Sequence, residues 1–252
     1  MTFADPPRPS VAGVDASASD GTLPRLGAVV GPLGVVSYFV ATAFHPGHDP
    51  GNLEAVLPEY AADAQWLAVH LAQFAGIALA AVALIALASS LMHGRGRGAA
   101  LARLGLLAAV VALAVYAVNQ AVDGVGIKFV ADSYVGASPT ARPGALLVAD
   151  AIRHLEVGTT TFFELNLGVT LVLLGLAIGW SQTYPTWLGW VAIADGIGWI
   201  AVALLLGARG FDVSVSPLAM AVTYVVGLWI VALAVLLWRS AGPRTGDQAA
   251  GS

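Results

Sequence analysis

The stretch DAQWLAVHLAQFAGIALAAVALIALASSLM, residues 63–92, opens with polar side chains and then has no charged residue from Phe74 to Met92. Its opening side chains stand at offsets of zero, three, seven and ten, and they are Asp63, Trp66, His70 and Gln73. At about 100° per residue, these offsets fall within about a quarter-turn of a helix. Lipid tails cannot form hydrogen bonds with these four side chains. The pattern therefore predicts a membrane helix whose first turns direct their polar side chains into a pocket.

The composition is typical of an integral membrane protein. Of the 252 residues, 58% are hydrophobic and 10% are charged, whereas a soluble domain carries about 25% charged residues. The lipid bilayer is therefore an expected partner. A net charge of −4 without a large basic cluster argues against nucleic acid as a partner. The absence of cysteine excludes disulfides, zinc fingers and thiol catalysis.

The apolar segments predict an all-α polytopic protein whose six transmembrane helices form one bundle. The predicted spans are 26–44, 63–92, 100–123, 157–180, 187–208 and 217–238. They give a transmembrane domain at 26–240, between disordered tails at 1–25 and 241–252. The first tail is rich in Pro, Ala, Ser and Asp and has neither the basic nor the apolar region of a signal peptide.

The basic residues predict the orientation in the membrane. The short loop at 93–103 carries three arginines, and the loop at 45–62 carries no Lys or Arg. Since cytoplasmic loops are enriched in Lys and Arg, both termini are expected in the cytoplasm. The richness in Ala, Gly and Val indicates a bacterial protein, and therefore a multi-pass protein of the inner (plasma) membrane.

Two longer loops are predicted on the outer side. The loop at 45–62 begins with HPGHDPGN, a run of turn-forming residues. The loop at 124–156 contains SPTARPG and then an amphipathic stretch at 145–156, which either lies on the outer surface or extends the fourth helix outward. Asp150, Arg153 and Glu156 in this stretch are expected to form a solvated face that carries an ion pair.

Polar side chains of several predicted spans lie at one depth, near the outer ends. Tyr116, Asn119 and Asp123 share a helix face through spacings of three, four and seven residues. Thr161 and Glu164 lie in the outer third of the fourth span. Together with the opening residues of the second span, they predict a water-accessible pocket open to the outside. Its ligand would be a small solute, a lipid head group or a cation.

Several of these residues also have a purely structural interpretation. His70 could be a neutral histidine hydrogen-bonded between helices, and Asn119 could join helices by its amide. A buried ionised carboxylate costs at least about 2.5 to 3.5 kcal/mol in the membrane, so Glu164 needs a partner, a proton or water. From the sequence, the candidate partners are His70, His154 and Arg153.

Asp195 lies near the middle of the fifth span, in the sequence ADGIGW. It is either a protonated structural acid or a step in a proton or ion path. The neighbouring Gly196 and Gly198 would let adjacent helices approach closely.

A metal site is a second interpretation of the polar residues. The candidate ligands are His45, His48, His70 and His154, with Asp123 or Glu164, and they could hold a divalent ion that activates water. The HPGHDPGN run is equally compatible with an ordinary turn. Haem is disfavoured because His70 is the only histidine clearly inside a predicted span. Motifs of zinc peptidases, serine hydrolases and nucleotide-binding loops are absent.

Three classes of function therefore remain open at the level of the sequence. The protein is a binding or transport protein with an outward-facing pocket, an intramembrane metal-dependent hydrolase, or a structural or sensory membrane subunit. Six helices can form a compact monomer or half of a symmetric pair.

Overall fold

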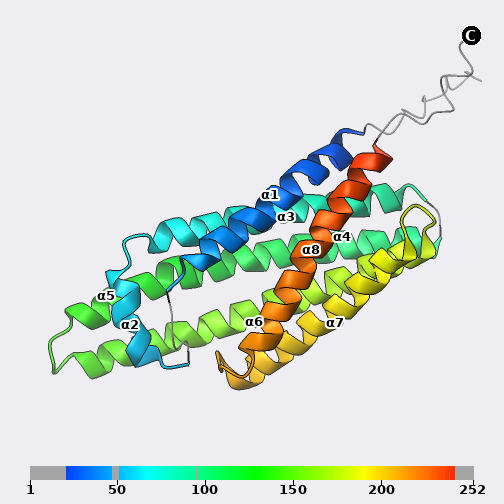
Figure 1. Cartoon of the computed structure of the whole chain (residues 1–252). Coiled ribbons are helices and arrows are strands. Elements are labelled where there is room, and N and C mark those ends of the chain that lie inside the picture. The colour runs from blue at the N-terminus through cyan, green and yellow to red at the C-terminus, as the bar shows by residue number, and fades with distance from the viewer. Residues whose placement is uncertain (1–20, 47–50, 95, 242–252) are drawn as a thin grey trace, which may run out of the picture.

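The computed structural model describes residues 21–46, 51–94 and 96–241, and this part of the chain is helical and contains no strand (Figure 1). In chain order the elements are α1 (Thr22–Ala43), α2 (Leu53–Ala62), α3 (Trp66–Met92), α4 (Arg97–Gln120), the π-helical segment η1 (Ala121–Ile127), α5 (Lys128–Gly136), α6 (Arg142–Trp180), α7 (Thr186–Arg209) and α8 (Ser216–Ser240).

Six of these helical segments are long and apolar enough to cross a membrane: α1, α3, the continuous run from α4 to α5, α6, α7 and α8. This confirms the prediction of an all-α protein with six candidate spans. The tails predicted at 1–25 and 241–252 fall mostly outside the described residues.

The start of α1 and the end of α8 lie at the same end of the bundle, as an even number of crossings requires (Figure 1). The Arg25 guanidinium donates a hydrogen bond from Nη2 to the carbonyl oxygen of Ala241 at 3.0 Å. The side of the membrane on which this end lies stays a prediction from the arginines of the loop at 93–103.

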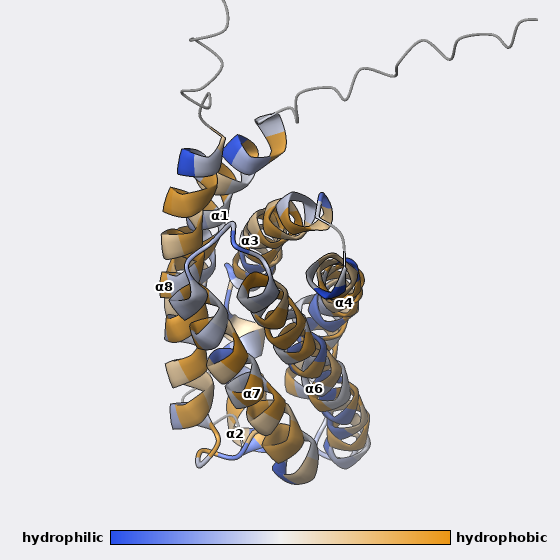
Figure 2. Cartoon of the chain, turned by 90° about the vertical axis from the view of Figure 1, so that its right-hand side faces the viewer, coloured by the Kyte–Doolittle hydropathy of each residue, from blue (hydrophilic) through white to orange (hydrophobic). Residues whose placement is uncertain are grey.

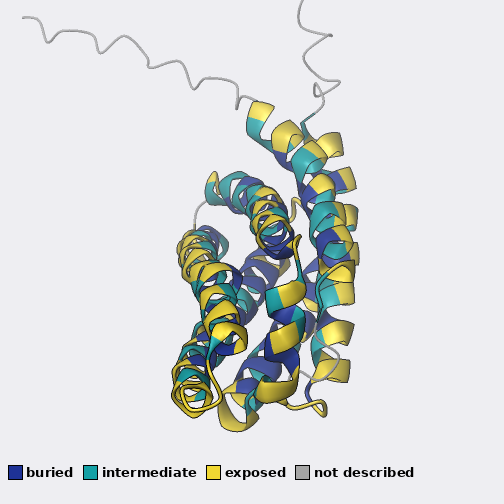
Figure 3. Ribbon diagram, turned by 90° about the vertical axis from the view of Figure 1, so that its left-hand side faces the viewer, coloured by how far each residue is buried: buried dark blue, intermediate teal, exposed yellow. Residues whose placement is uncertain are grey.

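The outer surface of the bundle is apolar, as a lipid-facing surface has to be. Leu33 and Val36 on α1 and Leu228 on α8 are exposed. Figure 2 shows hydrophobic residues along the outer faces of the helices, and Figure 3 shows the buried residues on their inner faces. Since lipid tails solvate such side chains, their exposure fits the membrane assignment.

Glycines allow the closest helix contacts. A Cβ atom on Gly34 of α1 would lie 2.4 Å from the carbonyl oxygen of Gly76 of α3, and one on Gly196 of α7 would lie 2.6 Å from that of Gly168 of α6. A Cβ on Gly198 would lie 2.6 Å from Val222 of α8. Both predicted glycines of α7 therefore face an adjacent helix, as small residues do in membrane bundles.

Two helices are longer than the predicted spans. The run from α4 to α5 reaches Gly136 instead of residue 123, and α6 begins at Arg142 instead of residue 157. With 39 residues, α6 is about 58 Å long at 1.5 Å per residue, which is more than a bilayer needs. The stretch at 145–156 thus extends the fourth spanning helix, one of the two predicted alternatives.

The extended helices form a cap with α2, which the sequence did not predict as a helix. The cap consists of α2, α5 and residues 142–156 of α6. Its buried apolar residues form one cluster with Trp66 of α3 and Ile127 of η1, and these residues of the cap are Val56, Leu57, Tyr60, Ala131, Tyr134 and Ala149. The Asn52 side chain accepts a hydrogen bond from the Ala55 N–H at the start of α2. Lys128 Nζ donates to the carbonyl oxygen of Ala61 at the end of α2, at 2.6 Å.

Candidate metal centre

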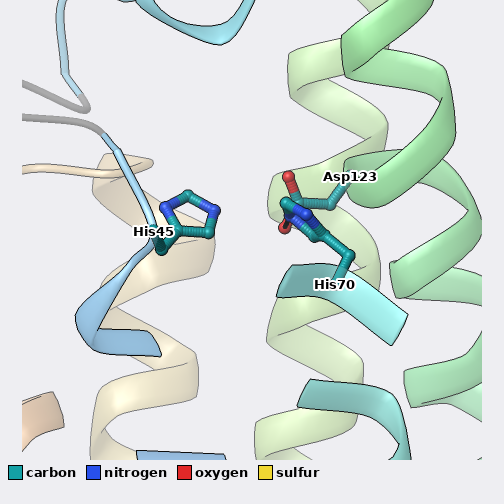
Figure 4. A group of neighbouring side chains, drawn as sticks. All are labelled: His45, His70 and Asp123. Atoms are coloured by element: carbon teal, nitrogen blue, oxygen red, sulfur yellow. Dashed lines mark ion pairs between the residues drawn. The ribbon is translucent and has the colours of Figure 1, made fainter. Parts of the chain in front are cut away.

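Three potential metal ligands meet where the cap joins the bundle. His45 follows α1, His70 lies in the second turn of α3, and Asp123 lies in η1 (Figure 4). One ligand atom from each of the three residues lies within 4.8 Å of the others. His70 Nε2 is 3.2 Å from Asp123 Oδ2. Segments that are far apart in the sequence thus bring three ligand groups to one place, and we call them the metal group.

In its neutral form, His70 has a buried lone pair in this group. The Nδ1–H of His70 donates a hydrogen bond to the carbonyl oxygen of Trp66 at 2.7 Å, so Nε2 of the neutral ring carries no proton. The His70 side chain is 2% exposed, and Nε2 has no hydrogen-bond partner among the described residues. The lone pair of Nε2 and the Asp123 carboxylate are two acceptors facing each other, and a proton or a metal cation between them removes the conflict.

The π-helical segment places Asp123 against α3. A π-helix has wider turns than an α-helix, and short π segments recur at functional sites. The Trp66 indole Nε1–H donates to the carbonyl oxygen of Gly124 at 3.0 Å. A Cβ atom on Gly124 would lie 2.7 Å from His70 Cβ. The absence of a side chain at Gly124 is therefore what lets His70 lie beside Asp123.

His45 presents the third ligand group. Its Nδ1–H donates to the carbonyl oxygen of Pro46 at 2.6 Å, which leaves Nε2 as the unprotonated nitrogen. The ring centroid lies 5.0 Å from that of His70 and 5.1 Å from that of Trp66. Burial lowers the pKa of His45 below its ordinary value, so the ring is held in the neutral form that binds metals.

Aromatic side chains enclose one side of the metal group. The Trp66 ring lies 4.4 Å from the rings of both Tyr60 and His70, and Trp66 and Tyr60 are buried. Burial also raises the pKa of the Tyr60 phenol, which keeps it protonated. These rings exclude bulk water on this side, and electrostatic interactions are stronger in such surroundings.

A buried ion pair adjoins the metal group. Arg153 Nη1 donates to both carboxylate oxygens of Glu156, at 3.1 and 2.8 Å, and the guanidinium lies 4.5 Å from the centre of the Phe211 ring. Glu156 is within electrostatic reach of Asp123, and Arg153 is within reach of His45. The predicted ion pair is confirmed, but the expectation that it is solvated is wrong, because the cap and the α7–α8 loop cover it.

Two residues of the predicted pocket hold helices together. Gln73 Nε2 donates to Thr42 Oγ1 of α1 at 3.1 Å. Asn119 Nδ2 donates to the hydroxyl oxygens of Thr159 and Thr160 of α6, at 3.1 and 2.7 Å. Asn119 thus has the interhelical role considered for it from the sequence.

The other members of the predicted pocket are dispersed. Asp63 follows α2 and accepts a hydrogen bond from the Gln65 N–H in the turn before α3, at 2.7 Å. Tyr116 packs against Phe163, with ring centroids 4.5 Å apart. The Thr161 hydroxyl donates to the Val157 carbonyl oxygen at 2.8 Å. Only His70, Asp123 and Trp66 of the predicted pocket lie together in the metal group and its wall.

The remaining predicted residues lie elsewhere. Glu164 Oε2 and Asp195 Oδ2 are buried and have no hydrogen-bond partner among the described residues. His154 is exposed, and its Nδ1–H donates to the carbonyl oxygen of Asp150 at 2.8 Å. His48 lies outside the described residues. Of the four candidate histidine ligands, His45 and His70 are the two that the structure brings together.

Comparison with protein-family models, curated proteins and solved structures finds no match to this chain. The metal group and its surroundings are therefore the basis for assigning a function.

Proposed function

We propose that this membrane protein is a metal-dependent hydrolase that holds one divalent transition-metal ion between His45, His70 and Asp123. One observation carries the proposal: His70 Nε2 is buried, lies 3.2 Å from the Asp123 carboxylate, and has no well-aligned hydrogen bond among the described residues. Buried polar atoms in proteins are nearly always paired. A cation bound by both atoms supplies the missing partner.

The donor set suits zinc. Two imidazoles and one carboxylate are a common ligand set of catalytic Zn²⁺, with the fourth position left to water. Ligand atoms around a tetrahedral zinc ion are about 3.4 Å apart, which the 3.2 Å between His70 and Asp123 already matches. The 4.8 Å limit on the whole group means that the ligands need only a small movement to close on the ion.

Such a site activates water. Zinc lowers the pKa of a bound water to about 7, so a hydroxide is available near neutral pH. That hydroxide would add to the acyl carbon of an ester or amide, and the bond from this carbon to the leaving oxygen or nitrogen would break. The proton that the water gave up would end on the leaving atom.

The packing below the metal group favours a fixed ion over a transported one. Gln73 and Thr42 are joined by a hydrogen bond one turn below His70. The next layer is apolar and contains Phe74, Tyr116 and Phe163. At this layer an ion moving inward would exchange three ligand groups for the single carboxylate of Glu164, which follows Phe163 on α6.

Metal analysis of the purified protein tests the proposal. After growth with zinc, we expect about one zinc ion per chain, and we expect His70→Ala and Asp123→Asn to lose it. His154→Ala is the matched control, since His154 is exposed, and it should keep the metal. A wild-type protein without metal, or a His70→Ala variant with full occupancy, would contradict the site.

A second measurement separates catalysis from binding. The zinc-loaded protein in detergent should release 4-nitrophenol from 4-nitrophenyl butyrate, and His70→Ala should not. If zinc binds and a panel of acyl esters and amides is left intact, the ion is not hydrolytic and the protein is a metal-binding membrane protein. Zinc at about 1,000 times its Kd should also raise the free energy of unfolding by about 4 kcal/mol in the wild type.

A further inference from the structure

A groove between α6 and α7 lies at the end of the bundle that contains the termini of the described chain, opposite the metal group (Figure 1). Its volume is about 220 Å³. Gly175, Gly179 and Gly189 contribute no side chain to it, and its other lining residues are apolar or aromatic except for Thr186. Because Gly179 is exposed, the groove opens to the lipid side of the bundle.

Two exposed tryptophans border this groove. Trp180 ends α6, and Trp190 lies in the second turn of α7. Exposed tryptophans are enriched at the membrane–water interface, at the level of the lipid head groups. From Trp180 the groove extends inward along α6 to Gly175, which lies about 7.5 Å deeper at 1.5 Å per residue. One end of the groove is thus at the head groups and the rest is beside acyl chains.

The end of the bundle that carries the groove is positively charged. The helix ends there include Arg25 of α1, Arg97 and Arg103 of α4, and Arg239 of α8, and all four are exposed. No described Asp or Glu lies in the loops on this side or within two turns of these helix ends. No ion pair between described residues includes Arg97 or Arg103.

Arg97 is the arginine that adjoins the groove. A Cβ atom on Gly98 would lie 3.3 Å from Trp180 Cβ, so the first turn of α4 packs against a tryptophan of the groove. Arg97 precedes Gly98 and begins α4. Gly96 before it has no side chain that could accept from the first N–H groups of the helix. An arginine and a helix N-terminus both favour a phosphate group.

We propose that the groove binds an anionic phospholipid of the leaflet on this side, with one acyl chain between α6 and α7 and the phosphate at Arg97 and the start of α4. A lipid-facing groove is filled by lipid or by another helix, and the charge selects between them. A second copy of the chain in the same orientation would bring further arginines to this level, whereas an anionic head group neutralises Arg97. The site does not depend on the hydrolase proposal.

Two lipids with identical acyl chains test the role of charge. Dioleoylphosphatidylglycerol is anionic, and dioleoylphosphatidylcholine has no net charge. Native mass spectrometry of the full-length protein in detergent measures how much of each lipid the protein retains. We expect at least about fivefold more of the glycerol lipid, as attraction to one arginine implies. Equal retention of the two lipids would overturn the proposal.

Arginine variants locate the head group. Arg97→Gln should lower retention of dioleoylphosphatidylglycerol about fivefold, to the level of dioleoylphosphatidylcholine. Arg239→Gln is the matched control, because it removes the same charge from the same end but lies on α8, which does not line the groove. A preference that is lost in Arg239→Gln and kept in Arg97→Gln would place the anionic lipid elsewhere and refute the site.

Filling the groove tests the position of the acyl chain. A Cβ atom on Gly179 meets no atom within 4 Å, so Gly179→Leu occupies the groove without displacing a neighbour and should abolish the preference for dioleoylphosphatidylglycerol. Gly158→Leu is the control on the same helix: its Cβ also meets no atom within 4 Å, and it lies near the capped end. Circular dichroism verifies the helical content of each variant. An unchanged preference in Gly179→Leu, or a wild-type dimer that Gly179→Leu dissociates, would overturn the proposal.

Discussion

The two ends of the bundle bury polar side chains in different ways. At the end that contains the termini of the described chain, the buried polar groups are paired: the Ser90 and Tyr184 hydroxyls are 2.8 Å apart, and the Trp229 indole donates to the Leu188 carbonyl oxygen at 2.8 Å. At the capped end, His70 Nε2 lies 3.2 Å from Asp123 Oδ2, an arrangement that requires a proton or a metal cation between the two atoms. Hydroxyl and indole groups paired in this way hold helices together, whereas a buried imidazole nitrogen beside a carboxylate is a pair of groups that can also bind a metal cation.

The apolar packing of the two ends differs as well. Around the paired groups, α3, α6, α7 and α8 form one large core rich in Ala and Leu. The capped end has a separate, smaller core whose largest members are Tyr60 and Trp66. We infer that the first core provides most of the stability of the bundle, and that the second positions the metal group and excludes water from it. This division can be tested by changing each end separately.

The largest loss of stability is expected from Leu171→Ala in the large core. Leu171 is fully buried, and truncation of a buried leucine to alanine typically costs about 2–5 kcal/mol through lost contacts and a residual cavity. Zinc content should stay unchanged, because the change is far from the capped end. Reversible denaturation in mixed detergent measures the first quantity and metal analysis the second.

Leu228→Ala is the control for this prediction, since Leu228 is 72% exposed to the lipid side and should change stability little. Loss of zinc in Leu171→Ala while the protein stays folded would mean that the two ends are coupled, and the proposed division of roles would be wrong.

An intermediate effect is expected from Gly124→Ala in η1. The added Cβ would lie 2.7 Å from His70 Cβ, and such overpacking typically costs about 1–3 kcal/mol. His70 has to move, so zinc binding should weaken more than stability alone implies. Gly126→Ala is the matched control in the same segment: its Cβ meets Ile152 at an ordinary 3.5 Å. Thermal unfolding with and without zinc distinguishes the two variants, and equal zinc affinity in both would contradict the proposed geometry.

The six spans could be predicted because lipid imposes its requirement on every residue that it touches. A run such as 74–92, which lacks charge, has no other stable environment. The meeting of His70 with Asp123 was also predictable in part. The ends of a predicted span show how deep each of its residues lies in the membrane. His70 and Asp123 both lie near the outer ends of their spans.

The direction in which the Asp123 side chain points was not predictable. Regular α-helical spacing places Tyr116, Asn119 and Asp123 on one face, but η1 begins at Ala121 and its wider turns change the direction of Asp123. Tyr116 therefore packs against Phe163 and Asn119 binds threonines of α6, while Asp123 turns to His70. Nothing in the residues of 121–127 distinguishes a π-helix from an α-helix.

The cap was missed for a different reason. An amphipathic stretch such as 145–156 has the same pattern whether its polar face meets water or another protein segment. Arg153 and Glu156 are buried because α2 and the loop containing Phe211 lie over them. This burial depends on contacts between segments about 60 to 100 residues apart in the sequence. The hydropathy pattern within one segment contains no information about such contacts.

The smallest effect is expected at the paired end, from Ser90→Ala. The Ser90 hydroxyl bonds the Tyr184 hydroxyl and the Leu87 carbonyl oxygen, and hydrogen bonds between membrane helices contribute about 0.6 kcal/mol on average. A double-mutant cycle with Tyr184→Phe isolates the Ser90–Tyr184 bond, and its coupling energy should be about 0.5 to 1 kcal/mol. Zinc content should be unchanged in all three variants. A coupling energy of several kcal/mol would show that the Ser90–Tyr184 hydrogen bond contributes far more than a typical hydrogen bond between membrane helices. The presence of a hydrogen-bond partner would then no longer distinguish structural from functional polar residues in this protein.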